Sequence, residues 1–79
     1  MKRILLTGVQ PGITEDTVRR VLADVGSVSQ ITIVRDGNPD RPLVVVEMSI
    51  SAAAAHLLVA RLTDYWLDGS RLSAHLLMR

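Results

Sequence analysis

Leu43-Val44-Val45-Val46, residues 43–46, is the stretch that decides the fold of this chain. Its side chains are all apolar, most of them are β-branched, and the run has no helical spacing. β-branched side chains favour strands, and a strand that is apolar on both faces lies inside a sheet. The sequence therefore predicts a central strand here, which Met48 prolongs.

A strand and a hairpin precede this run, and a helix follows it. Residues 28–33 partly alternate between apolar and polar, which is typical of a strand, and residues 35–40 are rich in turn formers. After the central strand, Ser51 can cap a helix whose apolar residues recur at i, i+3, i+4 and i+7. We expect this helix from about Ala52 to Thr63.

The N-terminal part predicts a strand, a turn and another helix. The apolar run of residues 4–6 is followed by a turn signal in residues 10–12, and Thr14 is placed to cap a helix. Apolar residues at helical spacing then predict a helix from about Glu15 to Val25, with Gly26 as its stop signal.

The C-terminal part predicts a connector and a last strand. Residues 64–69 end in an Asp-Gly turn signal, and Leu72, Ala74 and Leu76 then alternate with polar residues. The expected order is β-α-β-β-α-β. Right-handed crossovers place both helices on one face of a four-stranded antiparallel sheet, which is an α+β, ferredoxin-like two-layer sandwich.

Side chains alternate along a strand, so each strand offers one set to the helices and one set to the open face of the sheet. The set expected to face the helices is Ile4, Leu6, Ile31, Ile33, Val44, Val46, Leu72 and Ala74. The set expected on the open face is Leu5, Thr7, Thr32, Val34, Leu43, Val45, Glu47, Ser73, His75 and Leu77.

Composition limits the function classes. The 79 residues predict a single small domain, residues 1–79, with no room for a large enclosed active-site cleft. The absence of Cys excludes disulfide scaffolds, thiolate zinc sites and cysteine nucleophiles. No apolar stretch is long enough to cross a membrane, so we expect a soluble intracellular protein of the cytoplasm or nucleus, without membrane partners. The formal net charge of +1 gives nucleic-acid binding little general help.

Several segments resemble the RNA recognition motif (RRM) family, and the resemblance extends from Arg3 to Leu76. Residues 4–9 (ILLTGV) are similar to its first-strand motif, residues 12–18 to its entrance to the first helix, and residues 62–72 to the run before its last strand. The resemblance implies an RRM-type module that binds single-stranded RNA on the open sheet face.

The chain resembles a degenerate member of that family, because the stacking rings are missing. In the family, one aromatic residue on the first strand and two on the third stack on bases. Leu5, Leu43 and Val45 stand at those positions. Each base–aromatic stack is worth roughly 1 to 3 kcal/mol, so the sequence predicts weak or non-standard base recognition. The residues predicted to bind nucleic acid are Arg3, Leu5, Arg41, Leu43, Val45 and His75.

Two alternatives stay open on this face. The apolar residues Leu5, Leu43 and Val45 equally suit a protein–protein interaction or homodimerisation module. The charges also allow two interpretations, a locally basic sheet side that attracts phosphates or a mixed, solvated surface. The basic residues concerned are Lys2, Arg3, Arg35, Arg41, Arg71 and Arg79.

Nothing in the sequence points to catalysis, a metal or a cofactor. His56 and His75 have no carboxylate or Cys neighbour at metal-ligand spacing. The loop of residues 7–12 superficially resembles the phosphate loop of acylphosphatase, but acidic residues follow it where that family has an arginine. We therefore expect no enzyme and no cofactor.

The two aromatic residues of the chain, Tyr65 and Trp66, are adjacent in the expected connector. An aromatic ring near the end of a sheet often closes the core, whereas an exposed ring can anchor a partner. We expect one ring to close the core and the other to be exposed.

Overall fold

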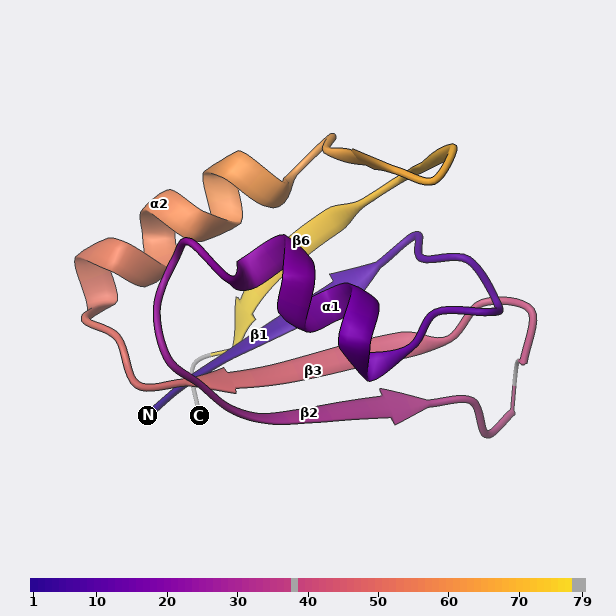
Figure 1. Cartoon of the computed structure of the whole chain (residues 1–79), viewed down its shortest axis with the longest axis horizontal. Helices are drawn as coiled ribbons and strands as arrows, with labels where there is room; N and C mark the ends of the chain where they lie inside the picture. Colours follow the sequence, from indigo (N-terminus) through magenta and orange to yellow (C-terminus); the bar gives the residue numbers. More distant parts are fainter. Residues whose placement is uncertain (38, 78–79) are drawn as a thin grey trace.

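The computed structural model describes residues 1–37 and 39–77. In chain order its elements are β1 (Lys2–Thr7), α1 (Glu15–Leu22), β2 (Val28–Val34), β3 (Leu43–Met48), α2 (Ala52–Leu62), β4 (Trp66–Leu67), β5 (Ser70–Arg71) and β6 (Ser73–Leu77). In this part of the chain, four strands form one antiparallel sheet in the order β2-β3-β1-β6. Both helices cover the same face of that sheet (Figure 1). The predicted ferredoxin-like α+β fold is confirmed.

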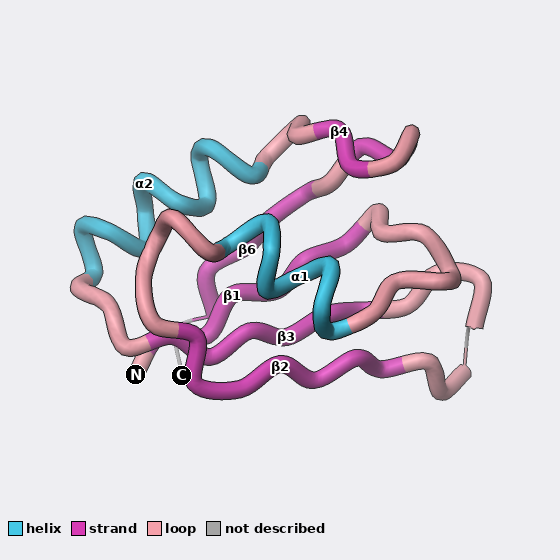
Figure 2. The backbone as a smooth tube through the Cα atoms, viewed as in Figure 1, coloured by secondary structure: helices cyan, strands magenta, loops and turns pink. Residues whose placement is uncertain are grey.

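The central position of β3 is also confirmed. β3 pairs with β1 on one side and with β2 on the other, as the tube drawing shows (Figure 2). Val44 and Val46 are fully buried under the helices, whereas Val45, between them, is only half-buried on the other face. Coverage by the helices accounts for apolar Val44 and Val46, whereas the apolar Leu43 and Val45 lie on the uncovered face.

Both helices begin at their predicted caps. The Thr14 hydroxyl accepts a hydrogen bond from the backbone N–H of Thr17 at 3.3 Å, and the Ser51 hydroxyl accepts one from Ala54 at 3.1 Å. These contacts satisfy backbone donors that have no partner inside the helix. The sequence therefore locates both helix starts.

The helix ends differ from the prediction. α1 ends at Leu22 rather than Val25, because the Val25 N–H bonds to the Leu22 carbonyl at 3.0 Å in a turn that redirects the chain toward β2. Val25 still packs against the core, so its apolar spacing extends the helical pattern beyond the helix. α2 ends at Leu62, and Thr63 is its C-cap.

A small hairpin replaces the predicted connector. β4 and β5 pair through a two-residue turn in which Asp68 and Gly69 have φ values of 50° and 83°. Positive φ at both central residues is the geometry for which Asp-Gly is favoured. Leu72, predicted in the last strand, instead exchanges backbone hydrogen bonds with the hairpin, donating to Tyr65 at 2.8 Å.

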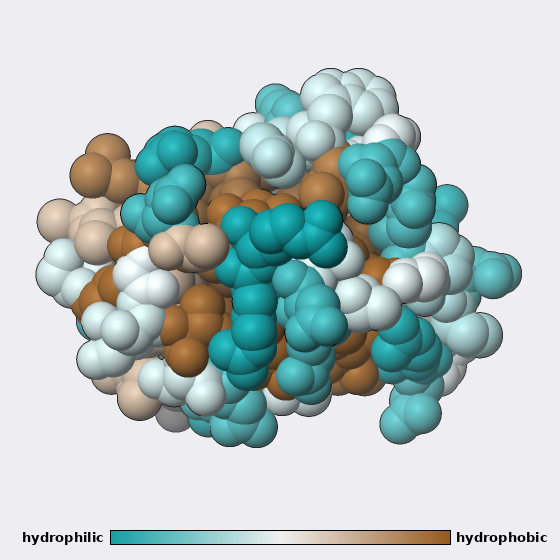
Figure 3. Space-filling model, viewed as in Figure 1, coloured by the Kyte–Doolittle hydropathy of each residue, from teal (hydrophilic) through white to brown (hydrophobic). Residues whose placement is uncertain are grey.

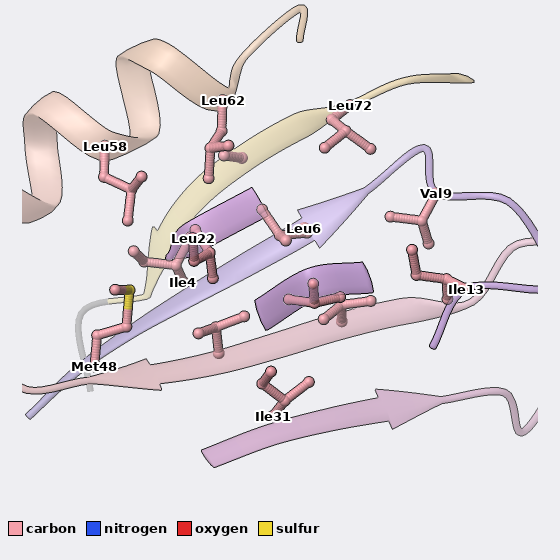
Figure 4. Close-up of a cluster of buried hydrophobic side chains, with 14 residues drawn as sticks. Ile4, Leu6, Val9, Ile13, Leu22, Ile31, Met48, Leu58, Leu62 and Leu72 are labelled. Atoms are coloured by element: carbon pink, nitrogen blue, oxygen red, sulfur yellow. The ribbon is translucent and has the colours of Figure 1, made fainter. Parts of the chain in front are cut away.

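The core lies between the helices and the sheet (Figure 4). All of the residues predicted to face the helices are buried except Ile33, which is half-buried and packs against the core. Val9 and Ile13, from the loop between β1 and α1, are buried at one end of the core.

Neither aromatic ring closes the core, so that prediction is wrong. Tyr65 and Trp66 keep 44% and 65% of their surface exposed, and the neighbouring Leu67 packs against the core instead. The reason is the hairpin: its strand alternation turns Leu67 inward and the adjacent Trp66 outward.

At the end of β1, the backbone of Gly8 packs closely against the backbone of Arg71 in this hairpin. Its φ is +79°, and a Cβ at this position would overlap the carbonyl oxygen of Arg71. Nearby, the Gln10 side-chain amide donates a hydrogen bond to the Asp68 carbonyl. The loop after β1 and the hairpin before β6 are thus held together at one end of the sheet.

Candidate nucleic-acid interface

The predicted site residues other than Arg41 lie on the open face of the sheet, on the side away from the helices seen in Figure 1, and Arg41 lies in the loop before β3. The strand register places Thr32, Val45, Leu5 and His75 in one row across β2, β3, β1 and β6. At the usual strand spacing this row is about 14 Å long. None of the side chains predicted for this face is buried.

An apolar strip occupies the part of this face nearer to the end of β2. Leu43 and Val34 are cross-strand partners and are 41% and 37% exposed. Val45 and Leu5, also partners, continue the strip and are half-buried. The structure thus brings together three of the predicted binding residues, Leu5, Leu43 and Val45.

His75 extends the row beyond the apolar strip. It is exposed and is the cross-strand partner of Leu5. In the four described strands it carries the only planar ring, because Tyr65 and Trp66 lie outside this sheet. Any stacking of a base on an aromatic ring of the sheet itself must therefore use His75.

Arg3 and Arg41 do not meet. Arg3 stands directly opposite Glu47, and its Nε lies 3.2 Å from Glu47 Oε1. Arg41 precedes β3 and is exposed, six residues before Glu47. Six residues of extended chain cover about 20 Å, so the two guanidinium groups lie toward opposite ends of the face.

Glu47 is the site residue that the sequence interpretation misses. The sequence predicts Glu47 on the open face but does not pair it with Arg3. The antiparallel register between β1 and β3, which places the two residues opposite each other, is the signal that could have indicated this pair. The side chains of Arg3 and Glu47 are 51% and 25% exposed. An exposed pair of this kind contributes about 0 to 1 kcal/mol, so Arg3 can exchange Glu47 for a phosphate at low cost.

The remaining cations favour a mixed surface over a continuous basic one. The Arg35 guanidinium donates to the Ile13 carbonyl at 2.6 Å, which fixes it against the loop after β1. Arg71 Nε lies 3.6 Å from Asp64 Oδ1. Among the residues that the structure describes, Arg41 makes no ion pair. Arg79, also in the predicted basic set, lies outside the described residues.

Other kinds of site are not found in residues 1–37 and 39–77. No group of three or more His, Asp or Glu side chains gathers there as a metal site. In the same residues, no helix has the length and apolar character needed to cross a membrane.

Comparison with family models gives no match, and no curated protein matches the sequence. Solved structures do match. RNA binding protein PG1 has a TM-score of 0.83 at 18% identity, over 100% of this chain and 96% of its own. Pes4 RRM3 has a TM-score of 0.85 at 14% identity, over 100% and 94%. The Rna15 RRM with bound RNA (GU) has a TM-score of 0.78 at 18% identity, over 98% and 83%. The chain therefore has the fold of RNA recognition motif domains.

Proposed function

We propose that residues 1–79 form a single module that binds single-stranded RNA on the open face of its sheet. The observation that carries the proposal is the row in which the register joins Val45, Leu5 and His75. The similarity in fold to RNA binding protein PG1, and to an RRM solved with bound RNA, supports it. The proposed activity is binding, without catalysis or a cofactor.

The chemistry of this face supports non-standard base recognition. Bases can lie against the aliphatic strip of Leu5, Leu43 and Val45, and one base can stack on the His75 ring. Arg41 at one end and Arg3 at the other supply charge for phosphates. Because the four strands carry a single ring, that of His75, and no Phe, Tyr or Trp, the binding free energy is smaller than for a sheet that carries several rings.

Replacement of His75 by alanine tests the proposal. The variant is expected to bind a mixed-sequence single-stranded RNA about tenfold more weakly, since one stack is worth roughly 1 to 3 kcal/mol. The measurement is a titration with RNA followed by NMR. In the wild-type protein, addition of RNA should also shift the amide resonances of Leu5, Leu43 and Val45. His56→Ala is the matched control, because His56 is exposed on α2, on the other side of the molecule.

The same titration separates the alternatives. Equal affinity of His75→Ala and wild type, with shifts away from the sheet, would contradict RNA binding on this face. An absence of RNA-induced shifts, with line broadening of Leu5, Leu43 and Val45 that grows with protein concentration, would instead support homodimerisation through the apolar strip. The exposed pair of Val34 and Leu43 is the feature that favours this second candidate.

Replacement of Glu47 by glutamine is expected to strengthen RNA binding. The change removes a negative charge from the face and releases Arg3 from its 3.2 Å contact. One unit charge about 6 Å from a phosphate in water corresponds to about a threefold change in affinity. The gain should appear in fluorescence-anisotropy titrations at low salt and vanish near 1 M salt, where the screening length is about 3 Å.

The double variant Glu47→Gln, Arg3→Ala is the control for the part played by Arg3. It should retain the gain from reduced repulsion but lose the gain from the released guanidinium. If Glu47→Gln weakened RNA binding at low salt, phosphates would not lie near this ion pair, and the assignment of Arg3 to the site would be wrong.

A further inference from the structure

The open face of the sheet continues beyond β6 into the small hairpin. β5 and β6 are separated only by Leu72, whose backbone N–H donates to a carbonyl of the hairpin at 2.8 Å, so residues 70–77 form one extended stretch. Leu72 and Ala74 are buried in the core. Because side chains alternate along an extended chain, Arg71 faces the same side as Ser73 and His75. Arg71 is therefore the next position of the open face after Ser73.

The hairpin adds an aromatic ring at this position. Trp66 is the cross-strand partner of Arg71, so the two side chains lie on the same face of the hairpin. Trp66 is 65% exposed, whereas its neighbour Leu67 packs against the core from the other face. Arg71 is four residues of extended chain, about 13 Å, from His75. One base cannot cover both rings, so Trp66 and His75 are two separate stacking surfaces.

The surroundings of Trp66 suit a nucleotide better than a protein partner. Its cross-strand partner Arg71 is charged, and Arg71 Nε lies 3.6 Å from Asp64 Oδ1. Both side chains of this pair are exposed, so Arg71 can exchange Asp64 for a phosphate at low cost. A ring that anchors a protein partner lies instead among well-packed, desolvated side chains. Seen from the helix side, the surface at the hairpin is mostly teal and white rather than brown (Figure 3).

We propose that Trp66 is a second stacking site of the RNA surface, where one unpaired base lies on the indole ring and Arg71 contacts the adjoining phosphate. This inference rests on the proposed RNA binding and adds a path to it. The strand runs from the row of Val45, Leu5 and His75 along β6 to the hairpin. Every base has a flat π face, so the contact favours single strands without selecting a sequence.

The first experiment follows the fluorescence of Trp66, which is the only Trp of the chain and therefore reports on this site alone. A base that stacks on an indole ring quenches its emission. Titration with the mixed-sequence single-stranded RNA is expected to quench most of the emission, with the same midpoint as the NMR shift of His75. The same RNA annealed to its complement should quench little, because its bases are stacked inside the duplex.

Substitutions separate the ring from its apolar surface. Trp66→Leu, which removes the ring but keeps an apolar side chain, is expected to weaken RNA binding about tenfold, whereas Trp66→Phe should stay within about threefold of wild type. Tyr65→Leu is the matched control. Tyr65 is adjacent and 44% exposed, but it lies beside Arg20 and Val21 of α1, on the helix side, so RNA affinity should not change.

Asp64→Asn tests the part played by Arg71. Asp64 has a φ of 65°, a conformation that Asn also adopts, so the turn should be kept. Loss of the carboxylate releases Arg71 and removes a repulsion, which should raise RNA affinity about threefold at low salt. An unchanged or lower affinity would mean that no phosphate lies beside Arg71.

The results distinguish failure of this inference from failure of RNA binding on the sheet. Shifts of Leu5, Val45 and His75 with unchanged Trp66 emission, and equal affinity of Trp66→Leu and wild type, would overturn the Trp66 site alone. An absence of both shifts and quenching would overturn both proposals. A change in emission that grows with protein concentration without RNA would identify a second copy as the occupant of this ring, which would also contradict the inference.

Discussion

Replacement of Gly8 by alanine is expected to lower the free energy of unfolding by about 3 kcal/mol, a large share of the stability of a small domain. The φ of +79° is unfavourable for any residue with a side chain, and the new Cβ would overlap the Arg71 carbonyl oxygen. That oxygen is backbone, and the next residue, Leu72, is held by its 2.8 Å hydrogen bond to Tyr65. The clash therefore cannot be relieved by rotation of a side chain.

Gly37→Ala separates the two causes. Gly37 has a φ of +86°, but no described atom lies within 4 Å of a Cβ placed there. This control should lose only the backbone contribution of about 1 to 2 kcal/mol. Urea unfolding of the two variants measures the difference. If Gly8→Ala were as stable as Gly37→Ala, the contact between β1 and the hairpin would be looser than the structure shows.

Replacement of Leu58 by alanine is the second change with a large expected effect. Leu58 is 2% exposed and contacts the core from α2, so its truncation leaves a cavity. Such changes cost about 2 to 5 kcal/mol, which for a chain of this size lowers Tm by at least about 10 °C. Thermal unfolding followed by circular dichroism is the measurement.

The neighbouring Leu57 provides the control. It lies on the same helix and is 68% exposed, so Leu57→Ala should stay within about 0.5 kcal/mol of wild type. Both changes introduce the same residue into α2, so helix propensity cancels in the comparison. Similar losses for the two variants would mean that the side chain of Leu57 is covered in solution, contrary to its exposure in the structure.

The fold is predictable from the sequence because the spacing of apolar residues within each segment indicates whether that segment is a helix or a strand. Residues 43–46 exclude a helix, and the spacing in residues 15–25 excludes a strand. Period two in the strands also assigns the open face correctly. The end of α1 is not predicted, because Val25 keeps helical spacing while it lies in a turn.

Local sequence patterns do not show which arginine side chains are free to bind a phosphate and which already contact another part of the chain. Arg3 and Glu47 are 44 residues apart in sequence, and Arg35 is fixed by the carbonyl of Ile13, 22 residues earlier. Such contacts depend on register and loop path rather than on neighbours in the chain.

The order of the strands has a consequence for synthesis of the chain. β1 is made first but lies in the sheet between β3 and β6, and β6 comes last. While residues 73–77 are still within the ribosome, one side of β1 presents unpaired N–H and C=O groups, which is the condition that favours pairing with a strand of another chain. Synthesis adds about 5 to 20 residues per second, so β6 is completed roughly 1.5 to 6 seconds after β3. Among the described strands, only β6 covers that edge of β1, so the edge stays open until β6 pairs with it.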